Sequence, residues 1–144
     1  MIFLDASAAA KRYCQEPGSD QVDDLFQESL PVCSVTVLRC ELTSVLNRKH
    51  REGDLTDTER HSARERVKQD LRWLRLVPVD EDLIIASVRL LDAHPLKTLD
   101  SLYLAGALSL QDVLSSPVTF VSSDRQLLRA AESEGLKVLN PEKA

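Results

Sequence analysis

The chain has 144 residues, of which 43 % are hydrophobic and 28 % charged, and its net charge is −5. This length and balance predict one soluble globular domain over residues 1–144, and no apolar run approaches the roughly 20 residues that a membrane span needs. The acidity argues against a passive nucleic-acid-binding module, which needs a basic surface for phosphate contacts. It does not argue against an enzyme whose site is a cluster of carboxylates.

The N-terminal residues and the cysteines indicate the cellular compartment. The chain begins with MIFLDAS, which lacks the basic segment of a signal peptide, so we expect a cytoplasmic protein. Cys14, Cys33 and Cys40 form no CxxC pair, which argues against a disulfide framework and against zinc. We expect all three to be buried free thiols.

Short apolar runs alternate with longer segments of helical periodicity along the chain. The strands are predicted at residues 2–4, 31–34, 76–79, 118–121 and 136–139. The helices are predicted at residues 6–14, 19–29, 35–51, 56–73, 81–93, 98–110 and 124–134. A capping box from Thr56 to Glu59 opens one helix, and Gly53 and Gly135 suit the ends of two others.

Strands separated by helices require crossover connections, and these produce a parallel sheet covered on both faces. The predicted fold is therefore a three-layer α/β/α sandwich. In such sheets ligands bind beyond the carboxyl ends of the strands, at the point where the strand order reverses. We expect the chemistry of this protein to lie there.

Two acids follow predicted strands directly. Asp5 comes after the first strand and Asp124 after the fourth, and the two will approach each other if those strands are neighbours. Each also suits the N-cap of the helix that follows, a role compatible with catalysis. Ser7 and Ser122 place a hydroxyl near Asp5 and Asp124 respectively, where it either hydrogen-bonds the carboxylate or solvates the first helical turn.

Two further acids lie inside predicted helices. Glu41 is expected in mid-helix, on or beside the apolar face; the alternative is a carboxylate at the edge of that face, in water. Asp100 belongs to TLDSLYLAGALSL, which is apolar nearly all round, so we expect Asp100 to be buried. The alternative is a first-turn acid stabilised by the helix dipole, with Thr98 as the cap.

Four carboxylates in one crevice would repel one another unless they were protonated or neutralised. Hard oxygen ligands of this kind suit Mg²⁺ or Mn²⁺, and such a site can hydrolyse a phosphodiester. The chain has no GxxxxGK[ST] loop and no GxSxG elbow. His50, His61 and His94 are isolated, which disfavours a zinc hydrolase or a histidine base.

The basic and aromatic residues are less specific. Lys11, Arg12 and Arg125 could contact an RNA backbone, although an ion-paired or solvated role is the stronger alternative. Trp73 is expected to pack in the core or in an interface, not to stack on a base. Its expected packing partners are Val67, Leu71 and Leu74.

Three segments resemble the PIN-domain family. The opening DASAAAKRYCQEPGS, the helix TLDSLYLAGAL and the closing TFVSSD occur in the family's order and spacing, over nearly the whole chain. Glu41 falls where PIN domains keep their second acid. Two positions depart from the pattern: Ser122 stands where threonine is common, and Tyr103 stands where histidine is common, so no role of that histidine carries over.

The size and the early Asp5 are most similar to the VapC-type toxins of type II toxin–antitoxin modules. The resemblance implies a Mg²⁺- or Mn²⁺-dependent endoribonuclease acting on structured or messenger RNA, with a cognate antitoxin as partner, and a homodimer. It also implies the strand order 3-2-1-4-5, with Asp5 and Asp124 on adjacent strands.

Two alternatives remain open from the sequence. One is a PIN-fold interaction module with weak or no catalysis, against which the presence of all four acids argues. The other is a Mg²⁺-dependent phosphatase with Asp5 as the nucleophile. Such enzymes usually have a second aspartate two residues later, where this chain has Ser7.

Overall fold

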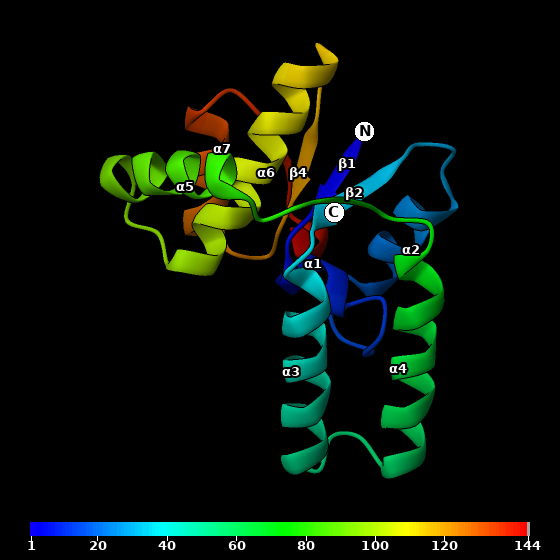
Figure 1. The fold of residues 1–144 in the computed structure, drawn as a ribbon. Helices are drawn as coiled ribbons and strands as arrows, with labels where there is room; N and C mark the ends of the chain where they lie inside the picture. The colour runs from blue at the N-terminus through cyan, green and yellow to red at the C-terminus, as the bar shows by residue number, and fades with distance from the viewer. Residues whose placement is uncertain (144) are drawn as a thin grey trace.

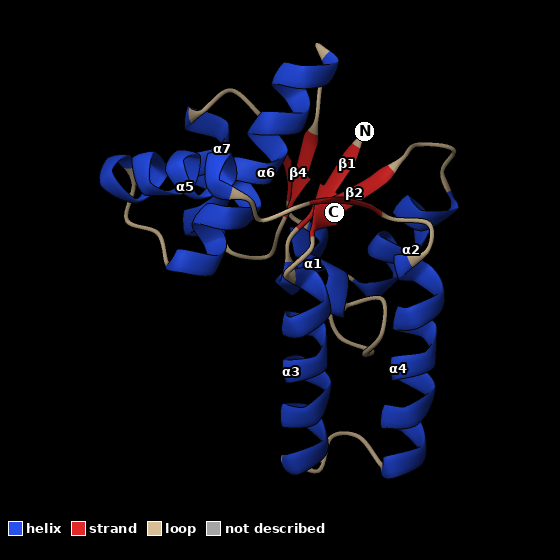
Figure 2. Ribbon diagram, viewed as in Figure 1, coloured by secondary structure: helices blue, strands red, loops and turns tan. Residues whose placement is uncertain are grey.

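The structure, a computed structural model, describes residues 1–143. Within them, five strands form a parallel sheet of order β3-β2-β1-β4-β5 (Figure 2). The strands are β1 (Ile2–Leu4), β2 (Val32–Val35), β3 (Arg75–Val77), β4 (Thr119–Val121) and β5 (Lys137–Leu139). The predicted parallel sheet and its strand order are therefore confirmed.

Helices cover both faces of this sheet (Figure 1). They are α1 (Ala6–Ala10), α2 (Ser19–Gln27), α3 (Leu38–Arg51), α4 (Asp57–Leu71), α5 (Glu81–Ala93), α6 (Thr98–Leu114) and α7 (Arg125–Ser133), followed by the 3₁₀ turn η1 (Pro141–Lys143). Helices α6 and α7 contact the sheet on one side, and α5 packs on α6. Helices α3 and α4 form a hairpin that extends away from the sheet, and α1 lies against its base (Figure 1).

The core sits between the central strands and the helices that cover them. The rings of Phe3 on β1 and Phe120 on β4 stack with their centroids 6.0 Å apart, and both side chains are fully buried. Gly106 brings α6 close to the sheet, because a Cβ there would lie 2.7 Å from Val35 Cγ2 and 2.9 Å from Phe3 Cζ. This close contact fixes the helix on which Asp100 lies.

Several predicted helix boundaries were wrong by a few residues. The first helix ends at Ala10, and turns replace its expected last residues. Helix α3 begins at Leu38, because Val35 pairs with Val77 as the last residue of β2. Helix α6 continues four residues beyond the expected end at position 110, since nothing before Pro117 interrupts it.

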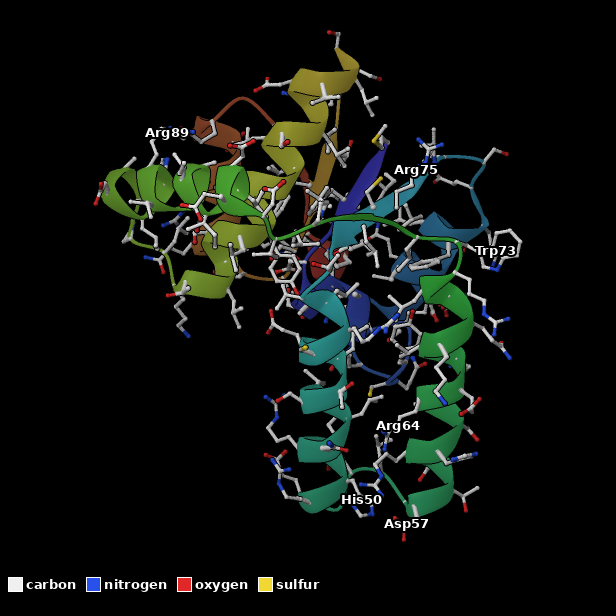
Figure 3. The ribbon with its side chains drawn as sticks, viewed as in Figure 1. His50, Asp57, Arg64, Trp73, Arg75 and Arg89 are labelled. Carbon is white, nitrogen blue, oxygen red and sulfur yellow. The ribbon has the colours of Figure 1, made fainter. Side chains whose placement is uncertain are left out.

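The expectations about the burial of Trp73 and of Cys40 need correction. Trp73 is 85 % exposed and projects from the molecule beyond the end of α4, so its expected place in the core is wrong, and the alternative, packing in an interface, stays a prediction (Figure 3). Its expected neighbour Val67 is buried. Cys14 and Cys33 are buried as expected, but Cys40 is exposed, because it lies on the outer face of α3.

Among residues 1–143, no helix combines the length and the apolar character needed to cross a bilayer.

Candidate active site

Asp5 and Asp124 lie at the carboxyl ends of the adjacent central strands β1 and β4. Leu4 is in register with Val121, and the Asp5 backbone N–H donates to the Val121 carbonyl at 3.3 Å. Both acids also cap helices: Asp5 accepts from the Ala8 N–H at 2.9 Å, and Asp124 accepts from the first N–H groups of α7. Each of the two acids therefore caps a helix and also lies where the strand order of the sheet reverses.

Asp5 is a buried carboxylate, only 4 % exposed, held by two hydroxyls. The Ser7 hydroxyl lies 2.8 Å and 2.9 Å from its two oxygens, and the Ser122 hydroxyl donates to Oδ2 at 2.7 Å. Burial raises the pKa of Asp5 to about 6, although these hydrogen bonds and the one from Ala8 lower it; the charge of Asp100 raises it further. The site thus holds a carboxyl group that ionises close to neutral pH.

Ser122 binds a different acid from the one expected. The sequence pairs it with Asp124, but its side chain donates to Asp5 and only accepts from the Asp124 backbone N–H, at 3.0 Å. The reason is topological: Ser122 follows β4, and β1 lies next to β4 in the sheet. The Ser7 hydroxyl, 3.3 Å from that of Ser122, completes the group around Asp5.

Glu41 lies in the first turn of α3, not in mid-helix, because the helix begins later than predicted. Its side chain is half-buried, and burial followed by the charge of Asp100 raises its pKa. Glu41 in turn acts on Tyr103, whose pKa is raised first by burial and then by the Glu41 charge. The position of Glu41 at the start of α3 places it at the same edge of the sheet as Asp5.

Asp100 interacts electrostatically with Asp5, Glu41 and Asp124. It raises the pKa of Asp5 and of Glu41, while burial and then the charge of Asp124 raise its own. It is half-buried in the first turn of α6, so the expectation of full burial was wrong. Thr98 is not the cap, because the helix begins at Thr98 itself, after Lys97.

Tyr103 is a site residue that sequence reasoning recorded only as a departure from a pattern. Its side chain is fully buried, and its hydroxyl interacts with the Glu41 carboxylate. The charges of Glu41, Asp5 and Asp100 all raise its pKa. One signal was available: Tyr103 lies three residues after Asp100, on the same face of the helix.

The donor chemistry of this site fits a hard divalent cation. Carboxylate oxygens are the ligands that Mg²⁺ and Mn²⁺ prefer, and the mutual repulsion of these acids is relieved when a cation lies among them. In residues 1–143, however, no group of three acidic, histidine or cysteine side chains is close enough together to hold a metal ion. The donors are thus of the right type, and their side chains are not drawn together in this structure.

The histidines lie elsewhere. His50 pairs with Asp57 at 2.9 Å at the far tip of the α3–α4 hairpin (Figure 3), and His94 lies 3.4 Å from Glu134. His61 is exposed on α4.

A cavity of about 510 Å³ is lined by Glu41, by Ala6 and Ser7, which follow Asp5 in the chain, and by Ser123, which precedes Asp124. Its charged and polar lining includes Ser7, Lys11, Glu41, Arg48, Lys49 and Lys97. Of the three expected RNA contacts, Lys11 lines this cavity, where it pairs with Glu16 and Glu142. From the sequence, Arg48 and Lys49 are cations that suit the C-terminal end of a helix dipole, and Lys97 has no assigned role. Only the fold places these three residues in one cavity with Ser7 and Glu41.

The other two expected RNA contacts lie outside this cavity. Arg12 pairs with Asp70 at 2.6 Å and with Asp23 at 3.1 Å, and its guanidinium lies 4.1 Å from the centre of the Phe26 ring. Arg125 is exposed at the start of α7 and lines a smaller hollow.

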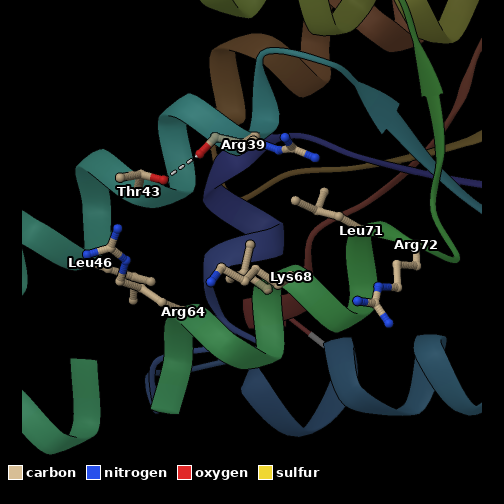
Figure 4. A pocket seen from close by; sticks show the side chains of 8 residues that line it. Arg39, Thr43, Leu46, Arg64, Lys68, Leu71 and Arg72 are labelled. Carbon is tan, nitrogen blue, oxygen red and sulfur yellow. Dashed lines mark hydrogen bonds between the residues drawn. The ribbon is translucent and has the colours of Figure 1, made fainter. Parts of the chain in front are cut away.

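A second cavity, of about 440 Å³, lies between α3 and α4 (Figure 4). Four basic residues and an apolar floor form it, and none of the four acids lines it. The basic residues are Arg39, Arg64, Lys68 and Arg72, and the floor consists of Leu46, Val67 and Leu71.

A parallel five-stranded sheet of this order, flanked by helices and with Asp5 and Asp124 at the carboxyl ends of adjacent strands, is a PIN-like α/β/α sandwich. The family model described as PIN domain matches residues 2–133, so the chain belongs to the PIN-domain family. PIN domains are generally metal-dependent nucleases. No match was found among curated proteins.

Proposed function

We propose that this protein is a Mg²⁺- or Mn²⁺-dependent endoribonuclease, with Asp5, Glu41, Asp100 and Asp124 as the residues that hold the metal. The observation that supports this most strongly is the position of Asp100. Its charge adds to burial in raising the pKa of Asp5 and of Glu41, and burial and then the charge of Asp124 raise its own. Such mutual repulsion among half-buried carboxylates is unfavourable without a cation, and their oxygens suit a hard one.

A bound divalent cation would supply an activated water and would stabilise the charge that develops on the phosphate. The residues of the chain do the remaining work. Ser7, Ser122 and the Ala8 N–H hold the Asp5 carboxylate in one orientation. Because the pKa of Asp5 is about 6, its carboxyl is close to half-ionised near pH 6, and a nearby cation would favour the ionised form.

We further propose that the protein is the toxin component of a type II toxin–antitoxin system, that it acts in the cytoplasm, and that it forms a homodimer. The support is the resemblance of its motifs and size to VapC-type toxins. Apolar side chains on α5 also support the homodimer: Ile84, Ile85 and Val88 are 39 %, 61 % and 52 % exposed. The antitoxin would be a short protein with a basic or amphipathic segment that reaches the acidic site.

The direct test is cleavage of RNA by the purified protein in Mg²⁺, Mn²⁺ or EDTA, with the new ends sequenced in total RNA after expression. Defined internal ends that appear with either metal and vanish in EDTA would support the proposal. A stable acyl-phosphate on Asp5, formed from a small phosphate ester without RNA cleavage, would instead identify a phosphatase. No cleavage and no acyl-phosphate would indicate a non-catalytic module.

The partner is tested separately. The protein encoded by the adjacent open reading frame should co-purify with this chain and suppress its cleavage of RNA. If the adjacent frame encodes no protein that co-purifies, the toxin–antitoxin assignment fails while the nuclease assignment stands.

A further inference from the structure

Lys11 is a buried cation at the wall of the cavity that Glu41 and Ser7 also line. Its side chain is 3 % exposed, and its ammonium lies 2.8 Å from Glu142 Oε1 and 3.3 Å from Glu16 Oε1. Glu142 comes from η1, about as far from Lys11 in the sequence as the chain allows. Figure 1 shows η1, in red, beside α1.

We propose that Glu142 occupies, on Lys11, the subsite of a phosphate of the nucleic-acid substrate, and that a bound strand displaces it. This inference rests on the proposed function, which places the scissile phosphodiester at the neighbouring acids. Glu142 of η1 would then compete with a substrate phosphate for binding to Lys11.

The cavity offers a phosphate more than one lysine. Arg48, Lys49 and Lys97 line it together with Lys11, four cations in a chain whose net charge is −5. Arg48 reaches only Glu52, at 4.0 Å, and Lys97 forms no ion pair within residues 1–143. These two cations are available to an incoming anion.

A buried hydroxyl in the same cavity also interacts with Glu142. Ser123 lines the cavity with its Oγ buried, and first the Lys11 ammonium and then the Ser123 hydroxyl lower the pKa of the Glu142 carboxyl. If the carboxylate leaves, this buried hydroxyl loses its acceptor, and a phosphate oxygen would replace it. The cavity therefore combines cations with a neutral donor, as phosphate recognition requires.

The burial of Lys11 explains why the Glu142 carboxylate must be replaced by another anion when it leaves. A buried ammonium without a counter-charge is strongly unfavourable, so Glu142 can leave only if another anion takes its place. Glu16 cannot compensate alone, because its second oxygen lies 3.4 Å from the Lys49 ammonium. A phosphate oxygen replaces the carboxylate oxygen without a change in the charge beside Lys11.

Glu142 is the partner that can move. Its side chain is 42 % exposed, whereas that of Glu16 is 25 % exposed and is held by two lysines. The backbone of η1 stays close to the start of α2, because Gly18 has no side chain: a Cβ there would lie 2.9 Å from the Pro141 carbonyl oxygen. The turn is thus anchored while the carboxylate is free to rotate into solvent.

The test measures binding in EDTA, so that neither a metal nor cleavage is needed. The probe is a fluorescein-labelled single strand of 2′-O-methyl RNA, and the readout is its anisotropy with wild type, Glu142→Gln, Glu142→Asp and Glu132→Gln. Glu132 is exposed on α7 and does not line the cavity, so Glu132→Gln removes the same charge elsewhere. Glu142→Asp keeps the charge and shortens the side chain.

Glu142→Gln should bind the strand about three- to fivefold more tightly than wild type, the range expected when one partly exposed ion-pair competitor is removed. Glu142→Asp should show part of this gain, and Glu132→Gln almost none. Lys97→Gln should weaken binding and lower the slope of log Kd against log salt by about 0.7, the value for one contact on a single strand. Thermal melts of each variant establish that it is folded.

Equal affinity of wild type and Glu142→Gln, or equal gains for Glu142→Gln and Glu132→Gln, would overturn the inference. These results are separable from the proposed function. A protein that shows the Glu142 effect in binding but cuts no RNA would refute the nuclease assignment alone. A protein that cuts RNA, but binds the strand equally tightly with and without the Glu142 carboxylate, would refute only the proposal that Glu142 competes with the substrate.

Discussion

The Ser122 hydroxyl donates a hydrogen bond of 2.7 Å to the carboxylate of Asp5, from which it is separated by 117 positions in the chain. The two residues meet because β4 and β1 are neighbours and both end at the same edge of the sheet. Burial raises the pKa of Asp5, and the hydrogen bond from Ser122 lowers it. The contact therefore orients the carboxylate and favours its ionised form. This relationship links the topology of the sheet to the chemistry of the site.

Asp5→Asn, Glu41→Gln and Asp100→Asn should each reduce RNA cleavage by about 100-fold or more, because ligation of the metal needs the charge and not only the shape. Asp124→Asn should have a milder effect, since an amide oxygen can still bind the metal through water. Asp112→Asn is the control, because Asp112 is exposed on the same helix as Asp100. Single-turnover cleavage of a labelled RNA measures all five. Wild-type rates for the first three variants would show that the site is assigned to the wrong residues.

Ser122→Ala should weaken Mg²⁺ binding by about tenfold, the lower range for the loss of a group that orients a ligand. The Ser122 hydrogen bond lowers the pKa of Asp5, so without it that pKa should rise further above 6. Titration calorimetry with Mg²⁺ measures the affinity. Ser109→Ala, an exposed serine on α6, serves as the control. Equal affinities for both variants would mean that the hydroxyl does not act through Asp5.

The pKa of Asp5 predicts how metal-free stability depends on pH. Its ordinary value of 3.8 is raised to about 6, so the folded protein holds this proton more tightly than the unfolded chain. The stabilisation is fully present below about pH 3.8 and is lost as the pH rises through about 6. The loss is on the order of 2–3 kcal/mol.

Asp5→Asn isolates this contribution, because asparagine still caps α1 but does not titrate. In EDTA, the melting temperature of Asp5→Asn minus that of wild type should increase from pH 4 to pH 7. Taking the difference cancels the titration of the other acids. A difference that stays constant over this range would contradict the raised pKa.

Asp100→Asn should raise the melting temperature in EDTA and greatly reduce the stabilisation by Mg²⁺. The substitution removes a charge that raises the pKa of Asp5 and of Glu41 and that is itself opposed by the charge of Asp124, so it relieves repulsion within the site. An increase of about 2–4 °C is expected for a domain of this size. Excess Mg²⁺ should stabilise wild type through binding to the native state, and the variant much less. If Asp100 were only a first-turn acid favoured by the helix dipole, the variant would melt below wild type and both would respond equally to Mg²⁺.

Ile85→Glu should shift a homodimer towards monomer, because it places a charge in the centre of the exposed apolar face of α5. Analytical ultracentrifugation at micromolar concentration measures the shift. Val113→Glu is the comparison, since Val113 is an exposed apolar residue near the end of α6. A wild-type protein that is already a monomer at this concentration would refute the dimer. A dimer that only Val113→Glu disrupts would move the interface to the end of α6.

Local patterns in the sequence determined most of the elements. The helix predicted at residues 81–93 is observed as Glu81–Ala93, and both hydrogen bonds of the capping box between Thr56 and Glu59 are present. The acids at strand ends were recognisable because a buried strand followed by an aspartate is a short-range signal. Such signals depend on interactions between residues three or four positions apart, which the sequence displays directly.

The tertiary structure decided the pairings between distant residues. That Ser122 contacts Asp5, and that Lys11 is buried against Glu142, depends on which strands are neighbours and on where η1 packs. Trp73 is exposed because α4 ends at Leu71. The helical periodicity that predicted packing for Trp73 does not extend to it. Periodicity specifies which face of an element is apolar, but the partners of a side chain follow from the packing of whole elements, and this is a property of the chain as a whole.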